Sequence, residues 1–426
     1  MNKRLTRFSI SAAAVLVLAA GCSSSGSPAG MPGPEMAPSS APTVSITHSP
    51  SHSPTTAAVA PDATEAAALR ATLTSLLSDH VWLAGNALDT AVRQQGDLKD
   101  PQVVGAVKAL DANSVALAEA IGSVYPDAEK PFLASWRQHI GFFVDYTLGK
   151  ATKNDEQVTK AKDDLDAYRT SFGQLINSVV PELPADAVAD ELKPHVASLF
   201  AAIDASVTGK PDYQTKLSTA ADHMAMTAEV LAGGIAKNKS LSGDVDGMAS
   251  TVRATLTSQL TAHVWLAGNA LDTAVQQKGD LKDPQVVGAV KALDANSVAL
   301  AETLGSVYPD AEKPFLASWR QHIGFFVDYT LGKATKNDEQ VAKAKDDLDA
   351  YRTSFGQLIN SVVPELPADA VAEELKPHVA SLFAAIDASV AGKPDYQTKL
   401  STAAEHMPMT AAVLTSGIVA NKKIES

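Results

Sequence analysis

The chain has 426 residues, one cysteine and a formal net charge of −13 at pH 7. Because phosphate backbones repel an acidic protein, these values argue against a nucleic-acid partner. The lone cysteine, Cys22, excludes an intramolecular disulfide and any metal site built from several cysteines.

Residues 1–21 have the three parts of an export signal. They begin with the basic residues Lys3, Arg4 and Arg7, continue with an apolar stretch, and end in small residues before Cys22. The apolar stretch is too short for a permanent membrane-spanning helix, so it predicts export. The ending LAAGC resembles the lipobox of bacterial lipoproteins. This resemblance implies a lipid on Cys22 and an extracytoplasmic protein anchored to the cell membrane; a secreted protein with one spare cysteine is the alternative.

The next segment, residues 22–63, consists mainly of Ser, Pro, Ala, Thr and Gly. It has too few large apolar side chains to repay the entropy of ordering, so we expect a disordered tether. Removal of the signal takes away three basic residues and no acidic ones, which changes the formal charge from −13 to −16.

Internal repetition decides the organisation of the rest of the chain. The segment that starts at Leu69 as LRATLTSLL returns at Val252 as VRATLTSQL, and the match continues with an offset of 183 residues. We therefore expect two copies of one domain, at 64–238 and 251–426, joined by a polar hinge at 239–250. Because the two copies are so similar, a residue that occurs in both is not thereby shown to be needed for function.

Each copy has the pattern of a helical bundle. Leu69, Leu73, Leu76 and His80 recur at helical spacing, alanine is abundant, and Pro or Gly stand where helices should end. The fold class predicted is all-α, with two tandem near-identical bundles of about six helices each after the tether. The helices predicted in the first copy are 65–94, 101–122, 127–150, 153–180, 185–208 and 211–237.

Four histidines per copy lie on or beside the apolar faces of four different predicted helices. Helical bundles build metal and cofactor sites from inward side chains on facing helices, so these histidines are the candidate ligands. The other reading is structural, because a lone histidine on an apolar face usually forms a hydrogen bond in the core. The candidates are His80, His139, His195 and His223, with their equivalents His263, His322, His378 and His406.

The most local cluster combines histidine with methionine. His223 and Met226 are three residues apart and share a helix face, and His406 and Met409 repeat the arrangement. Imidazole and thioether together suit copper(I), which makes copper the first candidate metal. Pro408 should break or kink the second helix, so the two clusters cannot be identical.

Other functions have weaker support in the sequence. Haem held by two histidines, or by His and Met, stays open, whereas c-type haem is excluded because Cys-x-x-Cys-His is absent. The chain lacks a nucleophile elbow, a phosphate loop and a His-Glu-x-x-His motif, so we expect no enzymatic activity, with a small residual chance of a metal-dependent one. The rival hypothesis is a non-catalytic envelope module whose histidines are structural and whose outer faces bind a protein partner.

Overall fold

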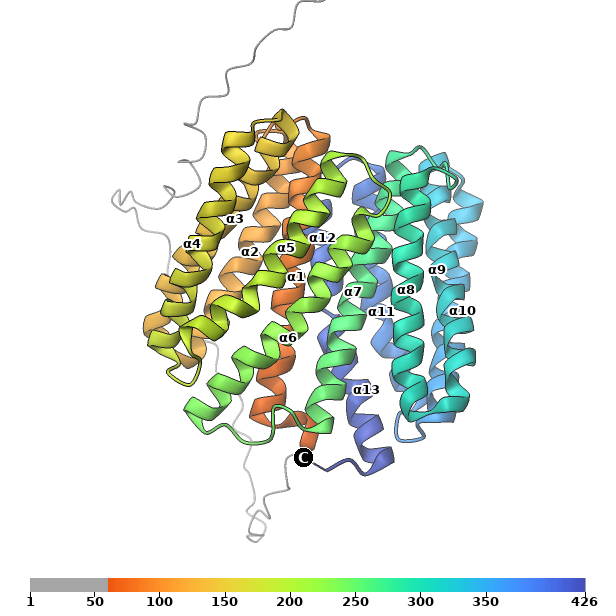
Figure 1. Ribbon diagram of the computed structural model, residues 1–426. Helices are drawn as coiled ribbons and strands as arrows, with labels where there is room; N and C mark the ends of the chain where they lie inside the picture. The colour runs from red at the N-terminus through yellow and green to blue at the C-terminus, as the bar shows by residue number, and fades with distance from the viewer. Residues whose placement is uncertain (1–59, 426) are drawn as a thin grey trace, which may run out of the picture. The chain divides into compact units, whose positions relative to one another are not determined.

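A computed structural model describes residues 60–425, and all regular structure within this range is helical (Figure 1). The predicted signal, the candidate lipidation site Cys22 and nearly all of the expected tether lie outside the described residues. The all-α prediction is confirmed. Of the helices between residues 60 and 425, none is both long and apolar enough to cross a bilayer.

The first copy contains α1 (Glu65–Arg93), α2 (Pro101–Val124), α3 (Glu129–Thr152), α4 (Asp155–Val179), α5 (Ala185–Val207) and α6 (Tyr213–Lys239).

The second copy repeats this order but divides its last helix in two. Pro408 stands at the start of α13, where it lacks the N–H that would continue the preceding helix. The break expected there is present, whereas α6 of the first copy is continuous. The second copy contains α7 (Met248–Gln276), α8 (Pro284–Val307), α9 (Glu312–Thr335), α10 (Asp338–Val362), α11 (Ala368–Val390), α12 (Tyr396–Ala404) and α13 (Met407–Lys422).

Helix ends follow local sequence signals. The side chain of Asp100 accepts a hydrogen bond from the N–H of Gln102 at 2.8 Å, and this cap starts α2 with Pro101 in its first turn. Asn154 caps α4 in the same way. Because such signals are local, the predicted bounds of the first copy differ from the observed ones by at most two residues.

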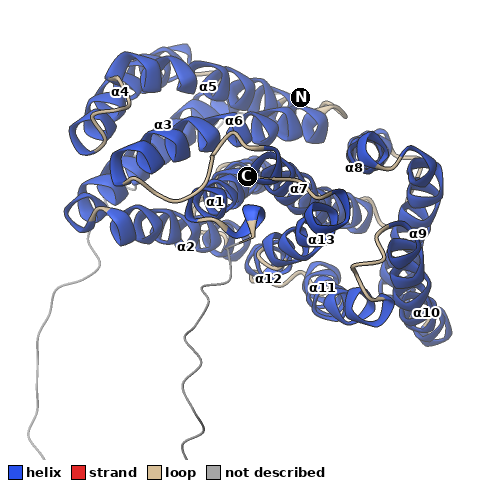
Figure 2. Cartoon of the chain, turned by 90° about the horizontal axis from the view of Figure 1, so that it is seen from below, coloured by secondary structure: helices blue, strands red, loops and turns tan. Residues whose placement is uncertain are grey.

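Helix α1 forms the centre of the first copy. Its stretch from His80 to Leu88 carries no Asp, Glu, Lys or Arg, and α7 has none between Arg253 and Asp272. A helix without a polar face must be covered on all sides, and α1 packs against α2 and α6 of its own copy and against α7 of the other. Figures 1 and 2 show α1 and α7 side by side between the two sets of outer helices. Trp82 is consequently fully buried and is not an exposed contact for a partner.

The contact between the copies is reciprocal. The side-chain amides of Asn86 and Asn269 donate to each other at 2.9 and 3.0 Å. Farther out, Gln102 donates to the carbonyl of Gly392 at 2.7 Å, and Gln285 donates to the carbonyl of Gly209 at 2.6 Å. Every one of these bonds has its counterpart 183 residues along the chain. The copies are therefore related by an approximate two-fold axis that passes between the two asparagines.

The segment between the copies, residues 240–247, is attached to the start of α1. Ser242 donates through both its N–H and its hydroxyl to the carboxylate of Glu65, each at 2.9 Å. Arg70 donates to the carbonyl of Val245 at 2.7 Å. The residues expected to form a hinge thus make specific hydrogen bonds with the first copy.

A contact of Asp79 between the copies breaks the two-fold relation. The indole N–H of Trp265 donates to the carboxyl of Asp79 at 2.6 Å, and Asp79 is only 2% exposed. Its equivalent in the second copy is Ala262, so the indole N–H of Trp82 has no hydrogen-bond partner within residues 60–425. Burial raises the pKa of Asp79 to about 7.

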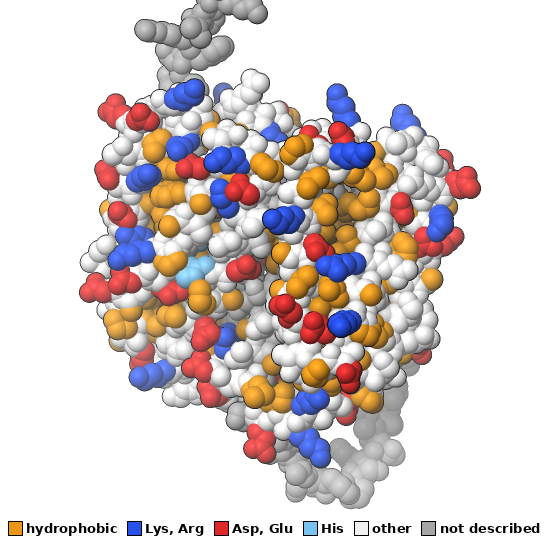
Figure 3. Space-filling model, turned by 45° about the vertical axis from the view of Figure 1, so that its right-hand side comes forward, with side chains coloured by type: hydrophobic (Ala, Val, Ile, Leu, Met, Phe, Trp, Pro, Cys, Tyr) orange, Lys and Arg blue, Asp and Glu red, His pale blue; other side chains and the backbone are white. Residues whose placement is uncertain are grey.

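The outer surface contributes less to stability than the core does. Acidic and basic side chains are interspersed with apolar ones on the face in Figure 3. Arg137 pairs with Asp111 at 2.7 Å and Arg320 with Asp294 at 2.6 Å, and all four side chains are about half exposed. Such pairs each contribute roughly 0–1 kcal/mol. Most of the folding free energy must therefore come from the buried helix faces.

Glycines at the contact between copies give a first test. A Cβ at Gly105 would lie 1.8 Å from the carbonyl oxygen of Pro394, and one at Gly288 would lie 1.9 Å from that of Pro211. We expect the double variant Gly105→Ala, Gly288→Ala to lower the free energy of unfolding by roughly 1–3 kcal/mol, because backbone atoms must separate. Urea unfolding measures this change. The control is Gly141→Ala, where a Cβ meets nothing within 4 Å, and which should be neutral or stabilising; equal losses in both proteins would contradict the interpretation.

Asp79 gives a second test. Its pKa in the folded state, about 7, lies above its unfolded value, so ionisation of the unfolded chain lowers stability as the pH rises from about 4 to 7. Asp79→Asn keeps an acceptor for Trp265 and removes the charge. We expect this variant to be more stable than the parent at pH 8, by on the order of a few kcal/mol, and equally stable at pH 4. Urea midpoints at the two pH values measure the difference, and an equal difference at both would refute the assignment.

Candidate functional site

Two of the predicted histidines form a buried pair in each copy. His80 on α1 and His139 on α3 are 1% and 3% exposed, and their Nε2 atoms lie 3.2 Å apart. The equivalent pair, His263 and His322, has the same separation and the same burial. The helices that carry the first pair start 64 residues apart in the chain, at Glu65 and Glu129, and the bundle brings the two imidazoles into direct contact.

A third histidine lies next to each pair. The ring of His378 on α11 is centred 6.3 Å from that of His263, and its equivalent, His195 on α5, is centred 6.3 Å from the ring of Phe143. Both are 5% exposed, and the Nδ1 atom of each has no hydrogen-bond partner among the described residues. Buried polar atoms normally have a partner, so this nitrogen is available to a ligand or a water molecule. We name His80, His139 and His195, with His263, His322 and His378, the histidine clusters.

Aromatic rings enclose the cluster of the first copy. The indole N–H of Trp136 donates to Nδ1 of His80 at 3.3 Å, which places the proton of this neutral imidazole on Nε2. Tyr168 stacks on His139 with ring centres 5.0 Å apart. Trp136, His139 and Phe143 follow one another at spacings of three and four residues, so α3 presents all three to the same side. The sequence SWRQHIGFF is therefore one wall of the cluster.

Burial keeps these imidazoles neutral. It lowers the pKa of His139 to about 3 and that of His195 to about 4, and the pKa of His80 falls well below its usual range. The neighbouring imidazoles add to the effect, because two cations at this distance would repel each other. The second copy repeats the values, about 3 for His322 and about 4 for His378. Neutral imidazole is the form that binds metal ions.

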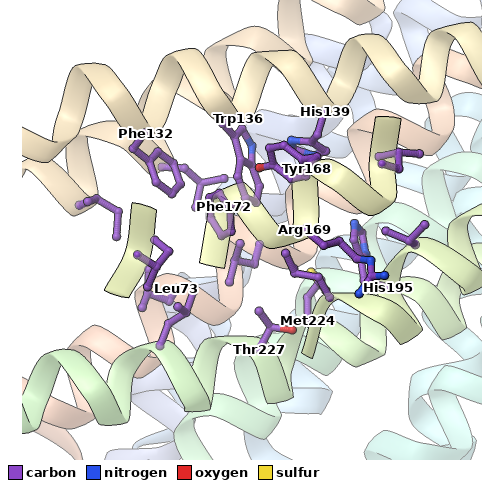
Figure 4. Close-up of a pocket in the computed structure, with 18 of the residues that line it drawn as sticks. Leu73, Phe132, Trp136, His139, Tyr168, Arg169, Phe172, His195, Met224 and Thr227 are labelled. Carbon is purple, nitrogen blue, oxygen red and sulfur yellow. The ribbon is translucent and has the colours of Figure 1, made fainter. Parts of the chain in front are cut away.

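A small cavity adjoins each cluster. In the first copy its volume is about 30 Å³, and His139, His195 and Met224 are among its lining residues (Figure 4). In the second copy it is about 60 Å³, with His378 and Met407, the equivalent of Met224, in its wall. These volumes hold a few water molecules or an ion. A porphyrin is far larger, so haem does not fit beside the histidines without rearrangement of the core.

The fourth histidine of each copy lies apart from the cluster. His223 is half-buried, and its Nε2 lies 3.1 Å from the carbonyl oxygen of Glu191. Met226, its expected partner, is 54% exposed. His406 lies 3.3 Å from the carbonyl oxygen of Glu374, and Met409 is 55% exposed. The structure thus brings three of the four histidines of each copy together in the core, and it leaves the fourth histidine half-buried and the methionine three residues after it exposed.

Sequence reasoning missed the methionine that does reach the cavity. Met224 is 1% exposed, and Figure 4 shows it below Arg169 and His195. The sequence does indicate this position, because Met224 lies on the apolar stripe of α6, and that stripe faces the other helices. Met226 is nearer to the surface, although it shares a helix face with His223 at a spacing of three residues.

Each pair of buried histidines, His80 with His139 and His263 with His322, offers only two nitrogen ligands at one point. Among residues 60–425, no group of three or more His, Cys, Asp or Glu side chains already surrounds one point as the ligands of a metal ion would. The pair alone therefore does not complete the coordination shell of a metal ion. The absence of a larger group does not extend to Cys22, which lies outside residues 60–425.

Comparison of the chain with protein-family models, with curated proteins and with solved structures gives no match.

The depressed pKa values predict how stability depends on pH. Unfolded histidines bind protons below about pH 6.5, whereas the clustered ones stay neutral down to about pH 4, so the folded state loses stability as the pH falls through this window. We expect His139→Gln to reduce the loss by roughly 1.4 kcal/mol per pH unit. His322→Gln should do the same in the second copy. Urea unfolding between pH 7 and pH 4.5 measures the slope, and an unchanged slope in both variants would be inconsistent with neutral buried histidines.

Proposed function

We propose that each copy binds one copper(I) ion at its histidine cluster, so that the chain is a two-site copper-binding protein. The observation that carries this proposal is the pair of Nε2 atoms 3.2 Å apart, present in both copies. We further propose that the protein works outside the cytoplasm, attached to the membrane by a lipid on Cys22, as its LAAGC ending suggests. Copper binding needs no catalytic step, and we propose a non-enzymatic role.

The distance within each pair suits a shared metal ion. Imidazole nitrogens bind transition metals at about 2.0–2.1 Å, and two of them at a tetrahedral angle are about 3.3 Å apart. The same distance also allows a hydrogen bond from Nε2 of His80 to Nε2 of His139. Binding would move the His80 proton to Nδ1, at the expense of the bond from Trp136. Binding therefore costs two hydrogen bonds, the one between His80 and His139 and the one from Trp136. At about 1 kcal/mol for each neutral bond, this cost is small beside typical metal affinities.

The surroundings of the first cluster favour a metal ion of low charge, whereas Glu374 is in the wall of the cavity in the second copy. The cavity of the first copy has no carboxylate in its wall, and the one cation there, Arg169, is paired with Asp166 at 2.6 Å. The cost of burying an ion in an apolar medium rises with the square of its charge, so a monovalent ion is less unfavourable than Zn²⁺ or Cu²⁺. Copper(I) is the monovalent ion that imidazole and thioether ligands prefer.

The buried methionines support the same choice. Met224 lines the cavity that His139 and His195 also line, and Met407 occupies the same place beside His378. A thioether is a soft donor that adds little to the binding of Zn²⁺ but stabilises copper(I). The His and Met combination anticipated from the sequence therefore recurs here with a different methionine.

Anaerobic titration with copper(I) tests the proposal. The parent protein should take up two ions per chain, the single variants His139→Leu and His322→Leu one ion each, and the double variant none. His223→Gln and His406→Gln are the matched controls, since these histidines lie outside the clusters, and they should keep both sites. Circular dichroism confirms that each variant is folded.

Spectroscopy of the loaded protein identifies the ligands. X-ray absorption should show nitrogen neighbours and a sulfur neighbour, and Met224→Leu with Met407→Leu should remove the sulfur contribution. A folded parent protein that takes up no copper(I) would end the proposal. It would leave the envelope module with structural histidines, whose outer faces bind a protein partner, as the better reading.

A further inference from the structure

A further cavity lies at the contact between the two copies, away from the histidine clusters. Its volume is about 200 Å³, several times that of either cavity beside the histidines. We call it the seam cavity. Its wall combines residues 209–211, Tyr213 and Gln214 of the first copy with the end of α7 in the second, and Asn86 and Asn269 form part of it.

The wall of the seam cavity includes a network of side-chain amides. Asn86 and Asn269 donate to each other, and each also donates to a glutamine of the opposite copy, Gln397 at 3.1 Å and Gln214 at 3.0 Å. These bonds use the Oε1 atoms of the two glutamines. Their NH₂ groups make no hydrogen bond to another described residue, and neither group is shut off from solvent. The cavity wall therefore offers amide donors that a ligand can use in place of water.

A buried phenol adds a further unpaired group. Tyr213 lines the seam cavity, is 7% exposed, and its hydroxyl makes no hydrogen bond within residues 60–425. A hydroxyl can both donate and accept, and leaving it unpaired in a buried place is unfavourable. A ligand with several hydroxyl groups would satisfy the phenol and the glutamines together.

The charges around the cavity balance. Arg93 pairs with Asp89 at 3.0 Å and lies 3.6 Å from Asp272, and with Lys210 the four formal charges sum to zero. Asp89 and Asp272 also each accept a hydrogen bond from a serine, at 2.7 Å in both cases. Lys210 makes no ion pair among the described residues, but the formal charge of the wall as a whole is zero, so the cavity carries no net charge that would select a cation or an anion.

We propose that the seam cavity binds a small neutral polyhydroxylated molecule, a monosaccharide or a sugar alcohol. The cavity has room for more than about ten water molecules, close to the number of non-hydrogen atoms in a monosaccharide. Amide and phenol groups donate to its oxygens, and the carboxylates of Asp89 and Asp272 accept from its hydroxyls. The site exists only where the two copies meet, and it is independent of copper.

One difference between the copies gives a matched variant. Gln276, in the cavity wall, is the equivalent of Arg93, whose longer side chain reaches across the two-fold axis to Asp272. Gln276→Arg gives the second copy the residue that the first already carries at the same place. Because Gln276 is exposed at the end of α7, the change should fill part of the cavity and leave the fold intact.

Calorimetry with the whole chain tests the proposal. The probes are glucose, galactose and mannitol at up to high millimolar concentration, with glycine and acetate as zwitterionic and anionic comparisons. We expect at least one of the three neutral probes to bind with one site per chain, and Gln276→Arg to weaken it at least about tenfold. Gln94→Arg, a substitution outside the cavity wall, should leave the affinity unchanged.

Three outcomes would overturn the proposal. The first is no binding by any neutral probe, which means that the cavity holds water only. The second is tighter binding of glycine or acetate than of the polyols, and the third is equal affinity in the parent and in Gln276→Arg. Copper(I) uptake, measured on the same samples, should be the same in all variants, so the two proposals can fail separately.

Discussion

The structure depends on the burial of two helices that have almost no polar face. Helix α1 carries no Asp, Glu, Lys or Arg from His80 to Leu88, and α7 carries none between Arg253 and Asp272. Each helix places a tryptophan, Trp82 or Trp265, fully out of water. One such ring buries roughly 150–250 Å², which at about 25 cal/mol per Å² is worth about 4–6 kcal/mol. A single copy covers only part of its central helix, and the other copy covers the rest. Two bundles that look separate in the sequence thus share one buried centre.

The histidine clusters exist because of this burial. The imidazoles of His80 and His139 approach each other only because both are neutral, and they are neutral because their surroundings are apolar. An exposed pair would be hydrated and partly protonated near pH 6, and it would compete poorly for copper(I). The short distance between the Nε2 atoms and the apolar surroundings are together the basis of the proposed copper(I) site.

Much of the fold could be predicted from the sequence, because local signals set it. Caps such as Asp100 and the helix break at Pro408 lie next to the bonds that they control. The site was harder to predict, because His80 and His139 meet through tertiary packing and no spacing in the chain encodes that. Met226 was favoured over Met224 for the same reason: nearness to His223 in sequence says nothing about which face meets the cavity.

The association of the copies was not anticipated, although two residues on apolar stretches hinted at it. Asn86 places a polar amide in the middle of an apolar helix. Gly105 is a poor helix former within a segment that otherwise favours a helix. The reciprocal contact resembles the interface of a homodimer whose two subunits have been joined into one chain. In a true homodimer every substitution appears twice, so an aspartate facing one tryptophan would require an aspartate facing the other. Fusion removes that constraint: Asp79 faces Trp265 while Ala262 stands at the equivalent place, and each half can acquire a property that the other lacks.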